Sequence, residues 1–273
     1  ERLPIDAFNT YKVRLWDLKL WKRVEVEVDE RLIWDDEAGE LLGCKPSLDN
    51  ELWPCVLEKA VAAHCGGWDK IDGGQASHAW RLLTGCREVY TLQPDGDGAF
   101  GCYGAFNPNT QSWEQLANSP ADGFRGMWPM EWPHVGGGGD LEQRLSEEEL
   151  FRRMCAWEDA NFILCAGTKS GSDTEQTDGI VDGHCYSILA CIDNAGGADI
   201  DMIKMRNPWG TQEFSAGGWG DGGPKWALYP KVKKACKPVS ADDGIFWMCR
   251  DSFFKYFKVI YLCAHDMSKW VDT

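Results

Sequence analysis

Apolar and polar residues alternate near the start of the chain, and this pattern predicts β-structure. The apolar positions are Val24, Val26 and Val28, and the acidic positions are Glu25, Glu27 and Asp29. A period of two places the valines on one face of a strand and the acids on the other, so one face contacts a core and the other contacts water. Residues 11–15 form a second alternating run, and we expect the two runs to pair as a hairpin or meander edge.

Two helices are predicted from caps and apolar stripes. The first covers residues 51–65, where Asp49 or Asn50 can cap it and Pro54 is tolerated in the first turn. Its apolar stripe consists of Leu52, Val56, Leu57, Ala60 and Val61. The second helix begins at a capping box formed by Ser146 and Glu149, which precedes Leu150, Phe151, Met154 and Trp157.

The second half of the chain reads mainly as β-strands. Strands are expected at residues 162–166, 185–192, 200–206 and 259–264, with one short helix at 251–257. Residues 93–140 are rich in Gly, Pro, Asn and Trp and have no sustained periodicity, which is typical of a long connection.

These elements predict an α+β protein with two parts. Residues 1–85 mix helix and strand, residues 86–140 form an irregular Gly- and Trp-rich connection, and residues 141–273 are mainly antiparallel β, with a boundary near Gly85. The 273 residues are 44% hydrophobic and 26% charged, a composition typical of a globular protein.

The charge balance narrows the range of partners. The chain has 43 acidic and 28 basic residues, a net charge of −15, and no Lys/Arg block. Nucleic acids and anionic membranes are therefore not expected partners, whereas cations are. The simpler alternative is that the surplus of acidic residues only keeps the protein soluble. The 15 Trp are accordingly interpreted as packing residues and not as platforms for stacking bases.

Twelve cysteines are scattered from Cys44 to Cys263 without a C-x-x-C pair, mostly within apolar runs. Buried free thiols in a reducing, cytoplasmic compartment are favoured over a disulfide framework. No apolar run has the ~18 residues of a membrane span, and residues 1–30 do not resemble a signal peptide. Because the chain starts at Glu1 without Met, we expect truncation or processing upstream.

Two short segments carry candidate chemistry: Asp182–Ser187, which contains His184, and Arg206–Gly210, which contains Asn207. They are separated by two strands and a turn, so the two side chains can meet. In a thiol protease an imidazole exchanges a proton with a cysteine sulfur, and a third group holds the other ring nitrogen. Parity places Ile203, Met205 and Asn207 on one face of their strand. If each segment is considered by itself, the simpler interpretation is that His184 is a structural histidine and that Asn207 begins an Asn-Pro turn.

Together the two segments resemble the calpain family of cysteine endopeptidases. Gly183-His184-Cys185-Tyr186-Ser187 is similar to the family pattern G-H-A-Y-S, and Arg206-Asn207-Pro208-Trp209-Gly210 matches R-N-P-W-G. Further similar segments occur in the family's order: Val13–Trp16, Val26–Leu32, Asn50–Trp53, Leu57–Ala60, Gly73–Gly74, Trp219–Asp221 and Asp243–Trp247.

The resemblance implies a papain-like, two-lobed core that binds protein substrates in extended conformation. It implies that His184 is the catalytic base and acid, that Asn207 orients it, and that Trp209 shields their hydrogen bond from water. Gly74 and Gly183 match family positions that bind substrate main chain, where a missing Cβ lets a peptide backbone approach.

The family's nucleophile motif, Q-G-x-x-G-D-C-W, does not occur in these residues, and none of the twelve cysteines has its context. We expect the nucleophile and possible further domains to lie outside this chain, which would then be inactive alone. A non-catalytic calpain-like scaffolding or binding module is the alternative, and a calcium-binding structural protein is a third.

The resemblance also implies calcium sites. Glu213, Asp221, Asp243 and the Ala241 carbonyl match the family's second-lobe ligands, but Ile245 stands where an acid is usual, so weakened binding is expected. Glu51 matches a first-lobe calcium ligand, and the other ligands of that site are expected upstream of this chain. Solvated loop acids are the simpler interpretation of all these carboxylates.

Overall fold

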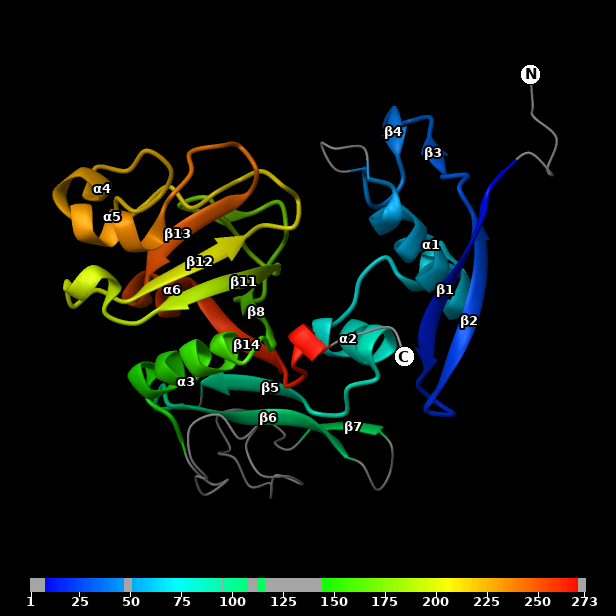
Figure 1. Ribbon diagram of the computed structural model, residues 1–273, viewed down its shortest axis with the longest axis horizontal. Coiled ribbons are helices and arrows are strands. Elements are labelled where there is room, and N and C mark those ends of the chain that lie inside the picture. The colour runs from blue at the N-terminus through cyan, green and yellow to red at the C-terminus, as the bar shows by residue number, and fades with distance from the viewer. Residues whose placement is uncertain (1–7, 47–50, 95, 108–111, 116–143, 270–273) are drawn as a thin grey trace. The chain divides into compact units, whose positions relative to one another are not determined.

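The computed structural model describes residues 8–46, 51–94, 96–107, 112–115 and 144–269. The chain divides into two compact units, Glu1–Gly85 and Cys86–Thr273. The first unit is drawn in blue to cyan and the second in teal to red (Figure 1).

The first unit contains the predicted hairpin. Strand β1 (Thr10–Asp17) pairs antiparallel with β2 (Lys22–Asp29), with Leu15 opposite Val24 and Val13 opposite Val26. The buried face of the hairpin packs on helix α1 (Trp53–Cys65) through Val28, which joins Val56 and Ala60 in a small core. The prediction of one buried and one solvated face is confirmed.

Helix α1 starts later than expected. Its N-cap is Leu52, which provides no side-chain hydrogen bond, so the helix does not use the predicted Asp49 or Asn50 cap, and both of those residues lie outside the described part of the chain. Pro54 is in the first turn, as predicted, because its missing N–H is not needed there. The helix ends at Gly66, whose φ of 100° is in the left-handed region that glycine tolerates.

An ion-paired lysine ties this helix to the hairpin. Lys59 Nζ contacts Asp29 Oδ1 at 2.5 Å and donates to the backbone oxygens of Asp29 and Arg31. Hydrogen bonds from Arg31 and then from Lys59 hold the pKa of the Asp29 carboxyl well below its usual range. The unit also contains β3 (Trp34–Asp35), β4 (Glu40–Leu41), a 3₁₀ turn at Trp68–Lys70 and helix α2 (Ala76–Thr84).

The second unit is built on an eight-stranded antiparallel sheet with the order β13-β12-β11-β8-β14-β5-β6-β7 (Figure 1). The strands are β5 (Val89–Pro94), β6 (Phe100–Asn107), β7 (Ser112–Gln115), β8 (Ile163–Thr168), β11 (Cys185–Ile192), β12 (Met202–Arg206), β13 (Ile245–Cys249) and β14 (Phe257–Cys263). A two-residue ribbon, β9 (Gln176–Thr177) with β10 (Ile180–Val181), lies outside the sheet.

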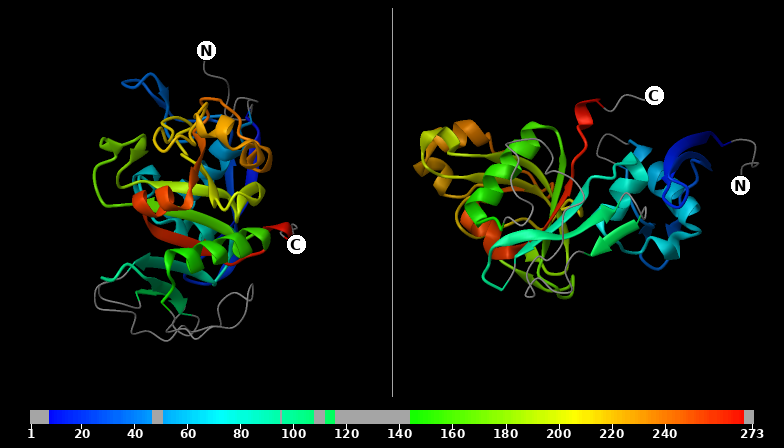
Figure 2. Two further views of the ribbon diagram at one scale, coloured as in Figure 1. Left: turned by 90° about the vertical axis from the view of Figure 1, so that its left-hand side faces the viewer. Right: turned by 90° about the horizontal axis from the view of Figure 1, so that it is seen from below.

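Helix α3 (Glu147–Asp159) lies against β8 and β11 (Figures 1 and 2). Its capping box is confirmed: Glu149 N–H donates to Ser146 Oγ, and the Glu149 carboxylate accepts from Ser146 N–H. Helix α6 (Arg250–Tyr256) follows β13, and the short helices α4 (Lys225–Leu228) and α5 (Pro230–Cys236) precede it. Turns of 3₁₀ type occur at Ala195–Gly197 and Met267–Lys269.

Both faces of the β12–β13 end of the sheet are buried. Ile203 belongs to the main core together with the α3 side chains Phe151 and Trp157. The preceding residue, Met202, points to the other face and packs in a second core with Trp219, Trp226, Val232 and Trp247. Each such large side chain contributes roughly 1.5–3 kcal/mol when fully buried, so these two cores hold the strand ends that carry the candidate site.

The fold is α+β, as predicted, with helix and strand mixed in the first unit and antiparallel strands dominating the second. Strands β5, β6 and β7 lie where an irregular connection was expected, between residues 86 and 140, and they extend the sheet of the second unit. Helix α2 and strand β13 were not predicted. The rest of the expected connection, residues 116–140, lies outside the described residues.

Seven of the twelve cysteines are buried. Among the described residues, no helix is both long enough and apolar enough to cross a membrane.

Candidate active site

Antiparallel pairing brings His184 and Asn207 together. His184 directly precedes β11, and Asn207 directly follows β12, its neighbour in the sheet. Because the strands run in opposite directions, the start of one lies beside the end of the other, and Ser187 stands opposite Arg206. The predicted meeting of the two side chains across 23 residues of sequence follows from this register.

The imidazole contacts the carboxamide directly: His184 Nε2 is 2.9 Å from Asn207 Oδ1. Asn207 is fully buried, and its Nδ2 donates to the backbone oxygens of Thr211 at 2.8 Å and Gln212 at 3.2 Å. These two carbonyls accept only, so the NH2 group must face them and Oδ1 must face the histidine. Since Oδ1 is also only an acceptor, Nε2 carries the proton, and Nδ1 is left as the basic nitrogen of the neutral ring.

Aromatic rings enclose this pair. The Trp209 ring lies 4.4 Å from the His184 ring, centroid to centroid, and its backbone N–H donates to Asn207 Oδ1 at 3.1 Å. Tyr186 meets the imidazole edge-on at 5.0 Å. Trp209 remains 46% exposed. Its ring lies beside the imidazole in a tilted arrangement, with an interplanar angle of 42°.

A residue that the sequence did not indicate holds the backbone of His184. Thr168, at the end of β8, is buried and accepts a hydrogen bond from His184 N–H through its Oγ1 at 3.0 Å. Its own N–H and hydroxyl both reach the His184 carbonyl, at 3.0 and 3.2 Å. No motif contains Thr168; only the pairing of β8 with β11 places it there.

The two glycines expected to contact substrate have different surroundings. Gly183 has a φ of +61°, and a Cβ there would lie 2.5 Å from the Gly171 carbonyl oxygen. The loop before His184 therefore requires glycine for its own packing. Gly74, in the first unit, has open space where a Cβ would stand.

The four expected second-lobe calcium residues lie close together. Glu213 Oε1 accepts hydrogen bonds from the backbone N–H groups of Asp243 at 3.2 Å and Gly244 at 2.9 Å. Asp221 Oδ2 accepts from Ala241 N–H at 2.8 Å. The loop is also joined to the candidate pair, because the Gly244 carbonyl accepts from Asn207 N–H at 2.8 Å.

Burial raises the pKa of Glu213, and the negative charge of Asp221 raises it further. Burial likewise raises the pKa of Asp221, with a contribution from Asp243. Carboxylate oxygens are ligands that calcium prefers, and a bound cation would relieve the repulsion between these acids. However, within the described residues no three His, Cys, Asp or Glu side chains are gathered closely enough to hold a metal ion. The donor types fit calcium, but the side chains do not form a complete site.

The expected first-lobe ligand, Glu51, is exposed, and its carboxylate accepts from Trp53 Nε1 at 3.2 Å. Residues 47–50, immediately before it, lie outside the described chain.

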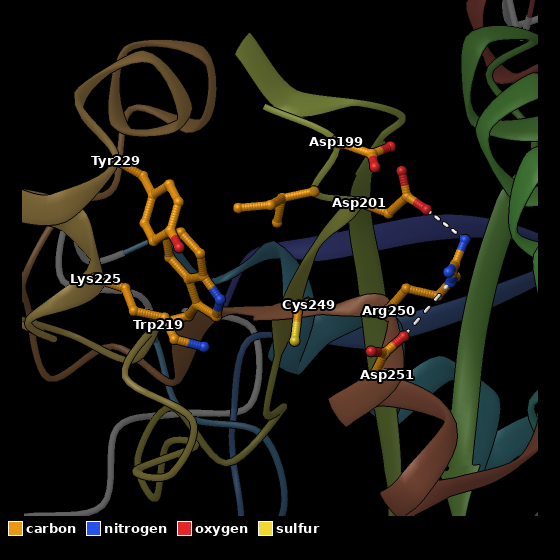
Figure 3. Close-up of a pocket in the computed structure, with 9 residues that line it drawn as sticks. Asp199, Asp201, Trp219, Lys225, Tyr229, Cys249, Arg250 and Asp251 are labelled. Carbon is orange, nitrogen blue, oxygen red and sulfur yellow. Dashed lines mark hydrogen bonds and ion pairs between the residues drawn. The ribbon is translucent and has the colours of Figure 1, made fainter. Parts of the chain in front are cut away.

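A separate pocket of about 200 Å³ opens in the second unit beside the 3₁₀ turn at Ala195–Gly197 (Figure 3). Trp219, Lys225 and Tyr229 line one side of it, and Asp201 and Arg250 form an ion pair of 2.6 Å on the other. None of the predicted site residues lines this pocket.

Comparison with known proteins agrees with the motifs. The family model described as calpain family cysteine protease matches residues 5–264. Calpain-A of Drosophila melanogaster is 27% identical over 260 residues, which cover 93% of this chain and 25% of that protein. Calpain-12 of Mus musculus is 24% identical over 258 residues, covering 94% and 28%. A calpain-type cysteine protease of Zea mays is 28% identical over 222 residues, covering 78% and 8%.

The chain thus spans between 8% and 28% of the length of these relatives. Because the family model matches nearly all of its residues, and because its helices and antiparallel sheet agree with a papain-like core, the chain belongs to the calpain family of cysteine proteases.

Proposed function

We propose that this chain provides the histidine and asparagine of a cysteine endopeptidase centre whose nucleophile lies outside its 273 residues. His184 acts as general base toward a cysteine thiol and as general acid toward the leaving amine. Asn207 holds the ring by accepting a hydrogen bond from Nε2–H through its Oδ1, so that Nδ1 faces the sulfur, and Trp209 excludes water from this hydrogen bond. The 2.9 Å contact between the imidazole and a fully buried carboxamide is the observation that carries the proposal.

The substrate in this proposal is a protein segment in extended conformation. Gly74 and Gly183 approach its main chain, as the family resemblance implies. The open space at Gly74 supports a role in binding. At Gly183 a substrate role comes in addition to the local packing requirement. We assign the first protease lobe to residues 1–85 and the second to residues 141–273. Residues 86–115 are assigned to the second lobe as well, because their strands continue its sheet.

The test uses the natural protein that contains this chain. A peptidyl epoxide that alkylates active-site thiols is added with and without calcium, and the labelled residue is identified by mass spectrometry. We expect one labelled cysteine, in a sequence of the type Q-G-x-x-G-D-C-W outside these residues. His184→Ala should slow labelling by about 10²–10⁴-fold, the usual contribution of a positioned base.

The alternative function is a non-catalytic scaffold, and Ile245, which stands where the family usually has an acid, favours it. Failure of the probe to label any cysteine, with or without calcium, would support the scaffold and reject the protease. Labelling of Cys185 by the peptidyl epoxide would reject the assignment of the nucleophile to another segment.

We further propose that calcium binds weakly at Glu213, Asp221, Asp243 and the Ala241 carbonyl, with Glu51 contributing to a first-lobe site completed by other residues. The pKa values of Glu213 and Asp221, raised by burial and by neighbouring carboxylates, support this. Ile245→Glu restores the missing acid and should raise calcium affinity in calorimetry, whereas the uncharged control Ile245→Gln should not. Equal affinities for both variants would contradict this ligand set. The intracellular, reducing compartment predicted from the cysteines fits the same proposal.

A further inference from the structure

Two cysteines lie side by side next to His184. Cys165 is in β8 and Cys185 is the first residue of β11, the neighbouring strand. In the antiparallel register Cys185 stands opposite Gly167, and Ser187 stands opposite Cys165. Residues two apart in a strand share a face, so the two cysteines are diagonal neighbours on one face of the sheet. Their Sγ atoms are 3.2 Å apart.

The two sulfurs are in contact but not bonded. An S–S bond is about 2.05 Å long, so the sulfurs must approach by roughly 1.2 Å for a disulfide to form. Because the residue directly opposite Cys185 is Gly167, no side chain stands across from it on β8. The family pattern G-H-A-Y-S has Ala at the position of Cys185.

The two thiols have unequal environments, which divides the chemical roles between them. Cys185 is partly exposed, whereas Cys165 is only 6% exposed. A hydrogen bond with Cys165 lowers the pKa of Cys185, and burial raises the pKa of Cys165. Cys185 is therefore the thiol that an oxidant can reach and that ionises first. The buried Cys165 is the resolving thiol, which attacks the oxidised Cys185 sulfur in a second step.

We propose that Cys165 and Cys185 form a closely spaced dithiol across two paired strands. Hydroperoxides convert this dithiol into a cross-strand disulfide one residue from His184. The Cys185 sulfur attacks the terminal oxygen of the hydroperoxide; the O–O bond breaks, an alcohol or water leaves with one proton, and Cys185 becomes a sulfenic acid. Cys165 then attacks the Cys185 sulfur, the S–O bond breaks, and water leaves with the second proton. Two thiols lose two electrons in total, and the hydroperoxide gains them.

Other thiol pairs in the chain serve as internal controls. Cys155 and Cys191 share a hydrogen bond, but Cys191 is buried and Cys155 lies on a helix. Cys155→Ala removes that pair and should leave the Cys165–Cys185 bond intact. Cys185→Ala should abolish it, and alanine at this position keeps the strand pattern of the family.

The experiment treats the reduced full chain with hydrogen peroxide under native conditions, alkylates the remaining thiols in denaturant, and maps disulfides by mass spectrometry. Chymotrypsin is the required protease. Trypsin would leave Cys155 and Cys165 in one peptide and Cys185 and Cys191 in another, because no Lys or Arg separates them. Cleavage after Phe162 and Tyr186 resolves the pairs. We expect a Cys165–Cys185 cross-link that dithiothreitol reverses.

A second probe needs no oxidation. One equivalent of a trivalent arsenical, phenylarsine oxide, bonds both sulfurs of a close dithiol and should protect Cys165 and Cys185 together from alkylation in the wild type. In Cys185→Ala the remaining Cys165 should lose this protection. Independent alkylation of both cysteines after peroxide, a sulfinic acid at Cys185 without a cross-link, or no protection by the arsenical would each overturn the proposal.

Discussion

Asn207→Ala tests the geometry of the site without requiring catalysis. The substitution removes the acceptor for the His184 Nε2–H and Trp209 N–H groups, and the donor to the Thr211 and Gln212 carbonyls. Each of these hydrogen bonds has a net value of about 1 kcal/mol, and water entering the space recovers part of it, so we expect a loss of about 2–4 kcal/mol in unfolding free energy. Loss of the bond to His184 alone should change the ratio of its tautomers about fivefold.

The assay is ¹⁵N NMR of the imidazole at a pH where the ring is neutral. In the wild type the Nε2 resonance should have the shift of a protonated nitrogen and Nδ1 that of an unprotonated one, because Asn207 Oδ1 can only accept. In Asn207→Ala both resonances should move toward intermediate values as the second tautomer becomes populated. Urea unfolding measured on the same samples gives the stability change.

Val232→Ala is the matched control. Val232 is fully buried in the second core, away from the histidine, so its truncation should cost stability without moving the tautomer ratio. A wild-type ring protonated at Nδ1, or a ratio that stays the same in Asn207→Ala, would refute the reasoning. An equal shift in Val232→Ala would show that general loosening, and not the lost hydrogen bond, determines the tautomer.

Three further predictions concern stability. Ser146→Ala deletes the capping box of α3 and should lower unfolding free energy by about 1 kcal/mol in urea titrations, with Ser146→Asp restoring most of it; an unchanged midpoint for the alanine variant would contradict this. Gly183→Ala should destabilise the chain clearly because of its positive φ and the Gly171 carbonyl, whereas Gly74→Ala should be neutral, and equal costs would reject the comparison. Asp29→Asn should lower thermal stability most above about pH 4, where the carboxyl of the unfolded chain is ionised. Because the pKa of this carboxyl is well below its usual range in the folded state, the deficit should shrink progressively as pH falls from about 4 toward the folded pKa; a deficit of the same size at about pH 7 and about pH 2 would argue against the ion pair.

Local patterns were sufficient for some elements and not for others. The alternation in β2 and the Ser146–Glu149 box depend on neighbours within a few residues, and both predictions are confirmed. The cap of α1 was wrong because a side chain that can cap a helix does so only if the helix begins beside it, and this helix begins after Leu52. Strand β6 was missed because its glycines and short runs resemble a loop until the sheet supplies hydrogen-bond partners.

The candidate site shows the same division. The motifs alone identified His184, Asn207 and Trp209 as a group. The roles of Thr168 and of the Thr211 and Gln212 carbonyls depend on backbone atoms that converge only when β8, β11 and the loop after β12 are assembled.

The sequence by itself determined the family, the chemistry available to it and the identity of the imidazole and its carboxamide partner, because those depend on residue types in fixed local order. Only the tertiary structure decided which ring nitrogen holds the proton, why Gly183 must be glycine, and that Cys165 and Cys185 meet. These properties arise from atoms far apart in the chain, whose distances are set by strand register and by the burial of two cores.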